Sequence, residues 1–316
     1  MQYLFYSIIK QQSHEKSFQK KKQILVLSLL AAFSAKGQST SIFRKMDSYS
    51  YQTLDRLWEL DPETNTETFL LTAYKPIYIM PFRFSSHRRE APFEQAPADG
   101  FVPEEEIQLD NVEATMQFSF KTKLAQRIFG SGALWLGYTQ KSYWQVYNAE
   151  YSRPFRETNY EPEIIFNYPV KFDFLKMKML GFAFNHQSNG REGHKFTRSW
   201  NRIILHAGFE KDQWSLIVRT WFALETGENP DIEDYMGRAS VLFNYRINKH
   251  LLTFKGQHSL RFGDDNHGSI ELDWTFPIYK NLKGYGQFFH GYGDAMIDYN
   301  QIHTIGGIGI VFSGTL

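Results

Sequence analysis

Apolar and polar residues alternate along most of this chain, in segments of about ten residues. In the segment Ser240 to Ile247, one face carries Val241, Phe243, Tyr245 and Ile247. A repeat of two is that of a β-strand with one apolar and one polar face. Such segments, separated by polar or glycine-containing turns, are typical of a transmembrane β-barrel.

We count about twelve such segments, an even number as in bacterial barrels. They span residues 69–81, 112–124, 132–145, 162–173, 175–188, 200–211, 213–223, 237–247, 250–259, 267–277, 282–292 and 303–312. Some connections are tight turns (211–212, 248–249 and 280–281), and others are long and polar (85–111, 146–161, 189–199 and 224–236). The pattern predicts an all-β fold, a single antiparallel transmembrane barrel over residues 69–316. A water-soluble β-sandwich or lipocalin-like barrel also alternates, but the long segments favour the membrane barrel.

The N-terminus has the order of a secretory signal peptide. Three lysines at 20–22 precede the apolar run Ile24 to Phe33, and small residues follow up to Gly37. The run is too short to span a bilayer. We therefore predict a signal peptide over residues 1–37, with an ordinary core helix as the alternative. Residues 38–68 are polar and are predicted to form an N-terminal lead-in.

Composition narrows the function classes. The 35 basic and 34 acidic side chains nearly cancel, which disfavours a nucleic-acid binder. Aromatic residues make up 17% of the chain, yet its mean hydropathy is −0.44, as expected of strands with one wet face. Cysteine is absent, which excludes disulfides, thiolate metal sites and a cysteine nucleophile.

The candidate chemistry lies between Gly181 and Arg202. His186 and Ser188 continue an apolar row that begins at Phe182, and Asn201 begins the apolar row of the next predicted strand. Polar side chains on a lipid-facing row are costly unless they pair with one another. The alternation therefore predicts that these three polar residues meet on the outside of the barrel, near one membrane boundary.

Their residue types fit nucleophilic catalysis. A serine hydroxyl needs an adjacent base, which His186 supplies, and the base needs a third group to orient its ring. The Asn201 carbonyl does this without a bare charge in a low-dielectric surrounding. A His-x-Ser pair alone is common, and the in-register asparagine makes the structural and catalytic interpretations about equal. No serine lies in a G-x-S-x-G elbow, which disfavours a soluble esterase.

The same stretch resembles the signature of the bacterial outer-membrane phospholipase A family, in which H-x-S-N-G-R is followed by S/T-R-S-W-N-R. Four further segments are similar to that family, and together they cover residues 112–312 in order. They are YTQKSYWQ (138–145), PFRETNYEP (154–162), NPDIEDYMG (229–237) and GYGDAMIDYN (291–300).

The resemblance implies a twelve-stranded outer-membrane barrel that hydrolyses phospholipid acyl esters as a calcium-bound homodimer. Ser188 is then the nucleophile, His186 the general base and Asn201 the orienting group. The Gly190 amide is an oxyanion donor, helped by calcium-bound water.

The resemblance also assigns calcium ligands: the Arg191 carbonyl, Thr197, and Ser152 from the second subunit. A site this poor in carboxylates is expected to bind weakly. Gln140 matches a residue that pairs across the dimer interface within the membrane. Two departures fall in the calcium site: the loop from Gly190 to Thr197 is one residue longer than the family pattern, and Thr197 stands where serine is usual.

Two other interpretations remain open at this stage. One is a catalytically inactive or porin-like barrel, and the other is a lipid A deacylase of the same membrane. The face that His186 and Ser188 occupy tests the first, because a pore places its polar groups inward. The four further segments favour the phospholipase over the second.

Overall fold

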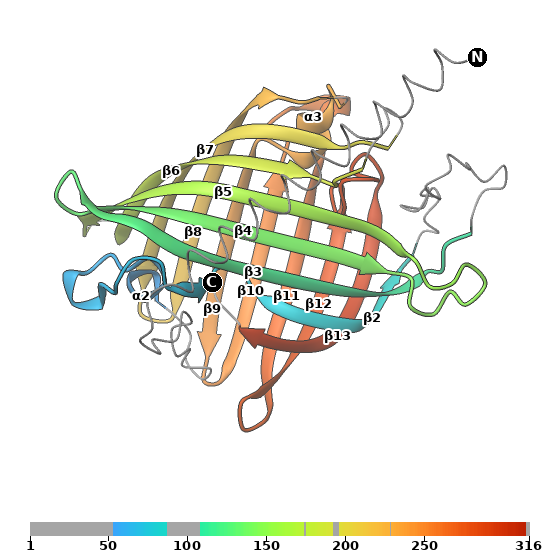
Figure 1. Cartoon of the computed structure of the whole chain (residues 1–316), viewed down its shortest axis with the longest axis horizontal. Coiled ribbons are helices and arrows are strands. Elements are labelled where there is room, and N and C mark those ends of the chain that lie inside the picture. Colours follow the sequence, from blue (N-terminus) through green and yellow to red (C-terminus); the bar gives the residue numbers. More distant parts are fainter. Residues whose placement is uncertain (1–52, 87–107, 174, 192–195, 228, 314–316) are drawn as a thin grey trace, which may run out of the picture. The chain divides into compact units, whose positions relative to one another are not determined.

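The computed structural model describes residues 53–86, 108–173, 175–191, 196–227 and 229–313. Within these ranges the chain forms one antiparallel sheet, which closes on itself where β3 pairs with β4 (Figure 1). Its strands are β1 (Leu71–Ala73), β2 (Ile77–Ser85), β3 (Val112–Ile128), β4 (Gly132–Trp144), β5 (Phe155–Phe172), β6 (Met177–Ser188), β7 (Ser199–Lys211), β8 (Trp214–Glu225), β9 (Ala239–Ile247), β10 (His250–His258), β11 (Gly268–Tyr279), β12 (Leu282–Gly291) and β13 (His303–Ser313).

The first two strands occupy one position in the sheet. β1 pairs with β3 around Lys121, and β2 pairs with the same strand around Thr115. Pro76, which has no amide hydrogen to donate to a ladder, lies in the break between them. β1 and β2 are therefore one interrupted strand, and the predicted barrel of twelve strands is confirmed.

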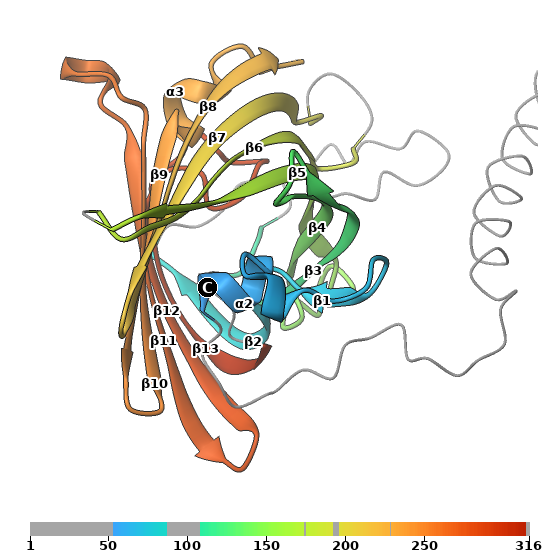
Figure 2. The same cartoon turned by 90° about the vertical axis from the view of Figure 1, so that its left-hand side faces the viewer.

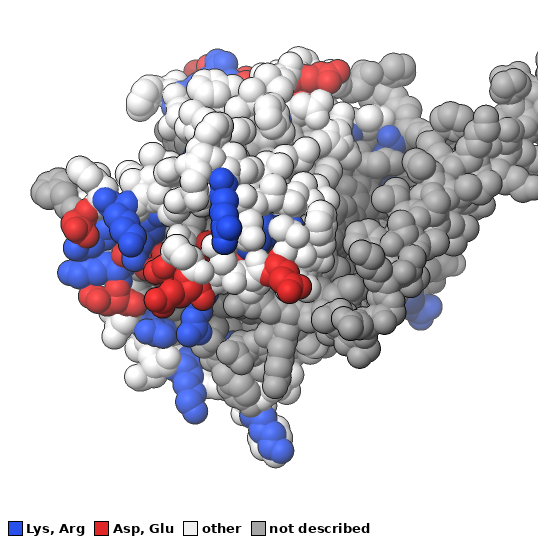
Figure 3. All heavy atoms as spheres, turned by 60° about the vertical axis from the view of Figure 1, so that its left-hand side comes forward, with Lys and Arg blue, Asp and Glu red and all other residues white. Residues whose placement is uncertain are grey.

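The predicted alternation matches the two surfaces of the barrel wall. On β6, Phe182 and Phe184 are exposed, whereas Ala183 is buried. On β9, the four apolar residues that share a predicted face are all exposed, and Asn244 is buried. On the face drawn in Figure 3, Lys, Arg, Asp and Glu side chains gather mainly toward one end and leave a broad area without charge. An apolar outer wall suits hydrocarbon, and a closed sheet leaves no unpaired edge within it.

The two ends of the barrel differ as predicted. At one end, two-residue turns join β7 to β8, β9 to β10 and β11 to β12. Asp212 and Asn248 begin two of these turns with positive φ, which short polar side chains tolerate. At the other end lie the longer connections, of which the one between β8 and β9 contains α3 (Ile232–Met236) and the one between β10 and β11 contains η2 (Gly263–Asp265).

The largest error in a predicted boundary lies at the start of β5. β5 begins at Phe155, so the second half of the predicted loop 146–161 is strand. Residues 156–159 are polar and all buried, so this end of β5 has polar side chains on both faces. The repeat of two in hydrophobicity disappears there although the strand continues.

The segment before the barrel packs inside it (Figure 2). α2 (Leu54–Trp58) begins after Thr53, whose side chain accepts a hydrogen bond from the Arg56 amide, and η1 (Pro62–Thr64) follows. The three apolar residues of α2 are buried with inward-facing residues of β4, β5, β6 and β7. The Leu54 amide donates to the Glu210 carboxylate at 3.0 Å.

Two inward-facing lysines of β3 hold this segment. The Lys121 ammonium lies 3.8 Å from the centre of the Trp58 ring, and Lys123 forms an ion pair of 2.6 Å with Glu59. These contacts fall within the predicted polar lead-in, whose composition gave no sign of a packed helix. The predicted signal peptide lies outside the described residues. No helix in the described part of the chain is long and apolar enough to cross a membrane.

The outward and inward faces can be tested with single cysteines, because the chain has none of its own. Leu252 is exposed on β10, and its neighbour Thr253 lines the lumen. In lipid vesicles, we expect a spin label at Leu252→Cys to collide with oxygen, which concentrates in lipid, more than with a water-soluble nickel chelate. A label at Thr253→Cys should lack that preference. The same accessibility at both positions would contradict the assigned faces.

Candidate active site

His186 and Asn201 meet on the outer face of the barrel. They are register partners on β6 and β7, and each is partly exposed. His186 Nδ1 lies 2.7 Å from Asn201 Oδ1. Because an amide oxygen only accepts, this contact places the ring proton on Nδ1 and leaves Nε2 with a free lone pair. The structure therefore brings together two of the three residues expected to meet.

Ser188 lies on the same face of β6, two residues beyond His186. It is partly exposed, and its register partner on β7 is Ser199. Among the hydrogen bonds of the described residues, none joins the Ser188 hydroxyl to the His186 ring. The serine is thus near the histidine along the strand without a hydrogen bond to it.

Glu225, which the sequence interpretation missed, contacts Asn201. The Asn201 Nδ2 group donates to a Glu225 carboxylate oxygen at 3.0 Å. Glu225 is the last residue of β8 and is exposed. Alternation along β8 assigns Glu225 to the inward row of Trp221 and Ala223, so the sequence pattern contained no signal of this contact.

The loop after Ser188 is organised by Asn189, which is fully buried. Its side-chain oxygen accepts from the Arg198 amide at 3.0 Å, and its side-chain nitrogen donates to the Phe196 carbonyl at 2.9 Å. Its own amide donates to the Arg198 carbonyl at 3.0 Å. One side chain thus ties both ends of the loop together around residues 192–195, which lie outside the described residues.

Gly190 follows with a backbone that only glycine fits easily. Its φ is +68°, and a Cβ placed there would lie 2.9 Å from the Tyr160 ring. The residue is exposed. Its backbone amide lies two residues from Ser188 along the chain.

The predicted metal ligands Arg191 and Thr197 lie together. The Thr197 hydroxyl donates to the Arg191 carbonyl at 3.2 Å. The Arg191 side chain reaches into the barrel, where its Nε lies 3.2 Å from the Glu157 carboxylate and its terminal nitrogen donates to the Arg156 carbonyl. Ser152 lies on the loop between β4 and β5, is exposed, and has a φ of +59°.

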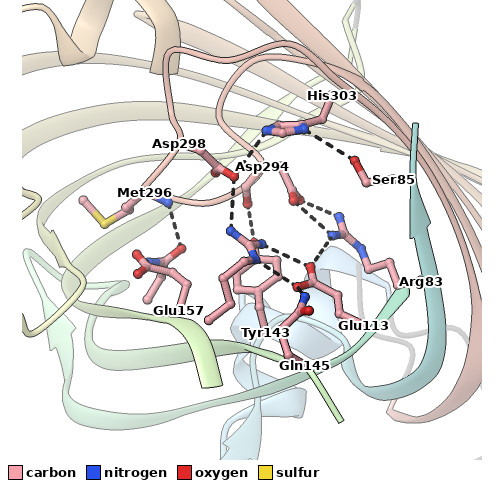
Figure 4. A network of polar contacts seen from close by, with 12 residues as sticks. Arg83, Ser85, Glu113, Tyr143, Gln145, Glu157, Asp294, Met296, Asp298 and His303 are labelled. Carbon is pink, nitrogen blue, oxygen red and sulfur yellow. Dashed lines mark hydrogen bonds and ion pairs between the residues drawn. The ribbon is translucent and has the colours of Figure 1, made fainter. Parts of the chain in front are cut away.

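Arg156 and Glu157 belong to a buried network of charges at the long-loop end of the lumen (Figure 4). Arg156 donates to Glu113 at 2.9 Å and to Asp298 at 3.1 Å, and Arg83 donates to Asp294 at 3.0 Å. The network joins β2, β3 and β5 to the loop between β12 and β13. The network therefore holds in place the residues that the Arg191 side chain contacts. Through Arg191 it also supports the loop after Ser188.

The loop between β12 and β13 is tied on its other side by Tyr299. The Tyr299 hydroxyl donates to the carboxylate of Asp231, the residue before α3. Burial and this hydrogen bond raise the pKa of Tyr299, so the phenol stays protonated as a donor. The two loops are thereby joined over the lumen.

Gln140 lies on the outer face of β4, in one row with Leu134, Leu136 and Tyr138 as predicted. Its amide accepts from the Tyr138 hydroxyl at 3.0 Å and donates to the Ser142 hydroxyl at 3.3 Å. It is thus a polar residue at the end of an apolar row. It lies two strands from Ser188 at the same level of the sheet, because Gln140 pairs with Tyr160 and Tyr160 pairs with Ser188.

The lumen contains a cavity of about 270 Å³, lined by side chains of both charge signs such as Lys255, Glu271 and Arg219. His186, Ser188 and Asn201 are not among its lining residues. His186, Ser188 and Asn201 therefore lie on the outer face of the barrel and do not line a pore.

The chain matches known proteins over most of its length. Residues 54–312 match the family model described as Phospholipase A1. A putative phospholipase A1 of Neisseria meningitidis is 38% identical over 275 residues, covering 83% of this chain and 70% of the relative. Phospholipase A1 of Escherichia coli is 36% identical over 205 residues, covering 64% of this chain and 70% of the relative.

Solved structures agree with these matches. The outer membrane phospholipase A of Escherichia coli superimposes with a TM-score of 0.68 at 31% identity, covering 79% of this chain and 94% of that one. The Salmonella typhi outer membrane phospholipase, solved as a dimer with bound calcium, superimposes with a TM-score of 0.69 at 30% identity, covering 82% of this chain and 96% of that one.

The buried network makes a prediction about stability. Arg156→Met removes one cation and leaves Glu113 and Asp298 buried with a missing partner, which typically costs about 3–5 kcal/mol. We expect the free energy of unfolding in urea, measured in detergent, to fall by that order. The exposed neighbour variant Arg153→Met should change it by no more than about 0.5 kcal/mol. Equal effects of the two variants would contradict the role of the network.

Proposed function

This chain belongs to the phospholipase A1 family, and we propose that it hydrolyses phospholipid acyl esters at the outer membrane in a calcium-dependent reaction. Ser188 is the nucleophile, His186 the general base, and Asn201 the group that orients the base. The family and the barrel fold both support the outer-membrane location.

The observation that carries the proposal is the 2.7 Å contact between His186 Nδ1 and Asn201 Oδ1 on the outward face of the barrel. Polar side chains on a lipid-facing surface cost free energy. The stability of the strand does not require a histidine or an asparagine at these positions, which favours a catalytic role for them. Placed beside Ser188, they form a base whose tautomer is fixed for taking a proton at Nε2. The site also faces lipid, where the substrate is.

In the reaction, His186 Nε2 takes the hydroxyl proton of Ser188 as the serine oxygen attacks the ester carbonyl. The resulting oxyanion accepts a hydrogen bond from the Gly190 amide. His186 then gives its proton to the departing alcohol, which leaves an acyl-serine. Water, activated by the same histidine, releases the fatty acid and restores the serine.

The oxygen atoms near Gly190 suit a calcium ion. The Arg191 carbonyl and Thr197 hydroxyl oxygens are 3.2 Å apart, close enough to serve one ion whose ligands lie about 2.3–2.6 Å away. We propose that these two oxygens hold calcium together with Ser152 from a second copy of the chain. The ion, when bound, supplies positive charge that stabilises the developing oxyanion.

Sharing of the metal between copies makes the active form a homodimer. Gln140 is proposed to lie in its interface, because an amide in an apolar row gains from a hydrogen-bonding partner on another chain. In this structure Tyr138 and Ser142 occupy its amide within the same chain. Activity that depends on the dimer would keep the enzyme idle while its copies are apart.

The nucleophile and the metal can be tested together. We expect wild type in detergent micelles to release fatty acid from phospholipid with calcium and not with chelator. Ser188→Ala should lower the rate by at least about a thousandfold, because the covalent step is lost. Ser199→Ala, at the register partner of Ser188, is the matched control and should remain active. Release by a folded Ser188→Ala variant would contradict the assignment.

The dimer interface can be tested by sedimentation in detergent. We expect calcium to shift wild type from monomer toward dimer, and Gln140→Leu to weaken that shift, because the amide loses its partner across the interface. His290→Leu also replaces an outward polar residue by leucine, but on β12, and it should behave as wild type. An undiminished dimer of Gln140→Leu would place the interface elsewhere.

A further inference from the structure

We propose that Glu225 is a positioning residue for catalysis, which fixes the Asn201 side chain in the one orientation that supports His186. The inference rests on the proposed function of the triad. Its basis is the pair of contacts made by one amide: Asn201 Oδ1 lies 2.7 Å from His186 Nδ1, and Asn201 Nδ2 lies 3.0 Å from a Glu225 carboxylate oxygen.

A β-bulge brings Glu225 to this place. Arg202 pairs with Ala223 and Asn201 pairs with Glu225, so Leu224 is an extra residue on β8. Without the bulge, Asn201 would face Leu224, and Glu225 would lie one position farther along. Bulges re-aim side chains and recur beside active sites. Here the bulge sets a carboxylate against the amide of the orienting residue.

The carboxylate matters because an asparagine amide has two orientations of nearly equal shape. If the amide turned over, its NH₂ group would face His186 Nδ1, and the ring would have to carry its proton on Nε2 instead. The histidine could then not accept the serine proton. A carboxylate only accepts hydrogen bonds, so Glu225 selects the orientation in which Nδ2 points to it and Oδ1 points to His186.

Glu225 also supplies the negative charge that the asparagine lacks. In a triad with aspartate, the third group stabilises the imidazolium that forms during the reaction. Here the neutral Asn201 amide lies next to the ring. The negative charge of Glu225 lies on the far side of that amide, to which it is joined by a polarised hydrogen bond. The charge is thus kept at the exposed end of β8 and away from the ring itself.

A structural role explains Glu225 less well. An exposed hydrogen bond between a carboxylate and an amide adds little stability. The outward residues before it, Phe222 and Leu224, are each 61% exposed, so the row belongs to the apolar outer surface. An acidic residue at the end of such a row is costly near lipid unless it serves the neighbouring site.

A double-mutant cycle with Asn201→Asp separates positioning from support of the fold. Both oxygens of an aspartate accept, so Asp at this position cannot be turned the wrong way, and a nearby carboxylate only repels it. We expect Glu225→Ala to lower kcat by about two- to tenfold in the Asn201 background, with KM unchanged. In the Asn201→Asp background, the same change should leave kcat unaltered or raise it. Glu225→Gln, which retains an acceptor, should lie between wild type and Glu225→Ala.

The outcomes distinguish a positioning role of Glu225 from a structural one. Leu224→Ala, at the neighbouring bulge residue, is the control and should match wild type. An equal loss from Glu225→Ala in both backgrounds would mean a structural role and overturn the proposal, as would wild-type kcat for both Glu225 variants. If Ser188→Ala keeps its activity, the proposed triad itself fails. If Ser188→Ala is inactive and Glu225→Ala has wild-type activity, only the present inference is overturned.

Discussion

A closed sheet in hydrocarbon can place polar side chains outward only where they pair, and the candidate site depends on this constraint. The outer wall of the described barrel is otherwise apolar along β6 and β7, with Phe184 and Leu205 as typical residues. His186 and Asn201 satisfy the constraint through one 2.7 Å contact. Because the ladder register makes them partners, the backbone hydrogen bonds of the barrel set their separation. The rigidity that the proposed base needs is therefore supplied by two neighbouring strands of the barrel and not by a loop.

The interior of the barrel meets a second constraint, that buried charges must be paired. Arg156 satisfies it with Glu113 and Asp298, and its carbonyl and the neighbouring Glu157 receive the Arg191 side chain. The wall of the lumen and the loop after Ser188 are thus one connected structure. Asn189 completes the connection by tying the two ends of the loop together. The inner surface supports the candidate site, and the outer surface carries the residues that we propose to be catalytic.

Alternation predicted what depends on local pattern: the twelve strands, the outward faces of His186 and Asn201, and the contrast between short turns and long loops. It missed α2, because the helical spacing of Leu54, Leu57 and Trp58 extends over only five residues and does not indicate a partner inside the lumen. It also missed the start of β5, where Arg156 and its neighbours are buried by charge pairing and not by hydrophobicity. Glu225 was out of reach for another reason, since a bulge changes register without changing the sequence pattern. The roles of all these site residues stay predictions: the triad of His186, Ser188 and Asn201, the oxyanion donor Gly190, the calcium ligands and Gln140.

The central claim is that the outward constellation around Ser188 is the hydrolytic site. The most direct measurement is covalent labelling of the folded, calcium-loaded protein with a long-chain sulfonyl fluoride, followed by mapping of the modified residue by mass spectrometry. The account predicts one labelled residue, Ser188, with labelling lost in His186→Ala because the serine then lacks its base. Labelling at another serine, with fatty-acid release inhibited in parallel, would contradict it.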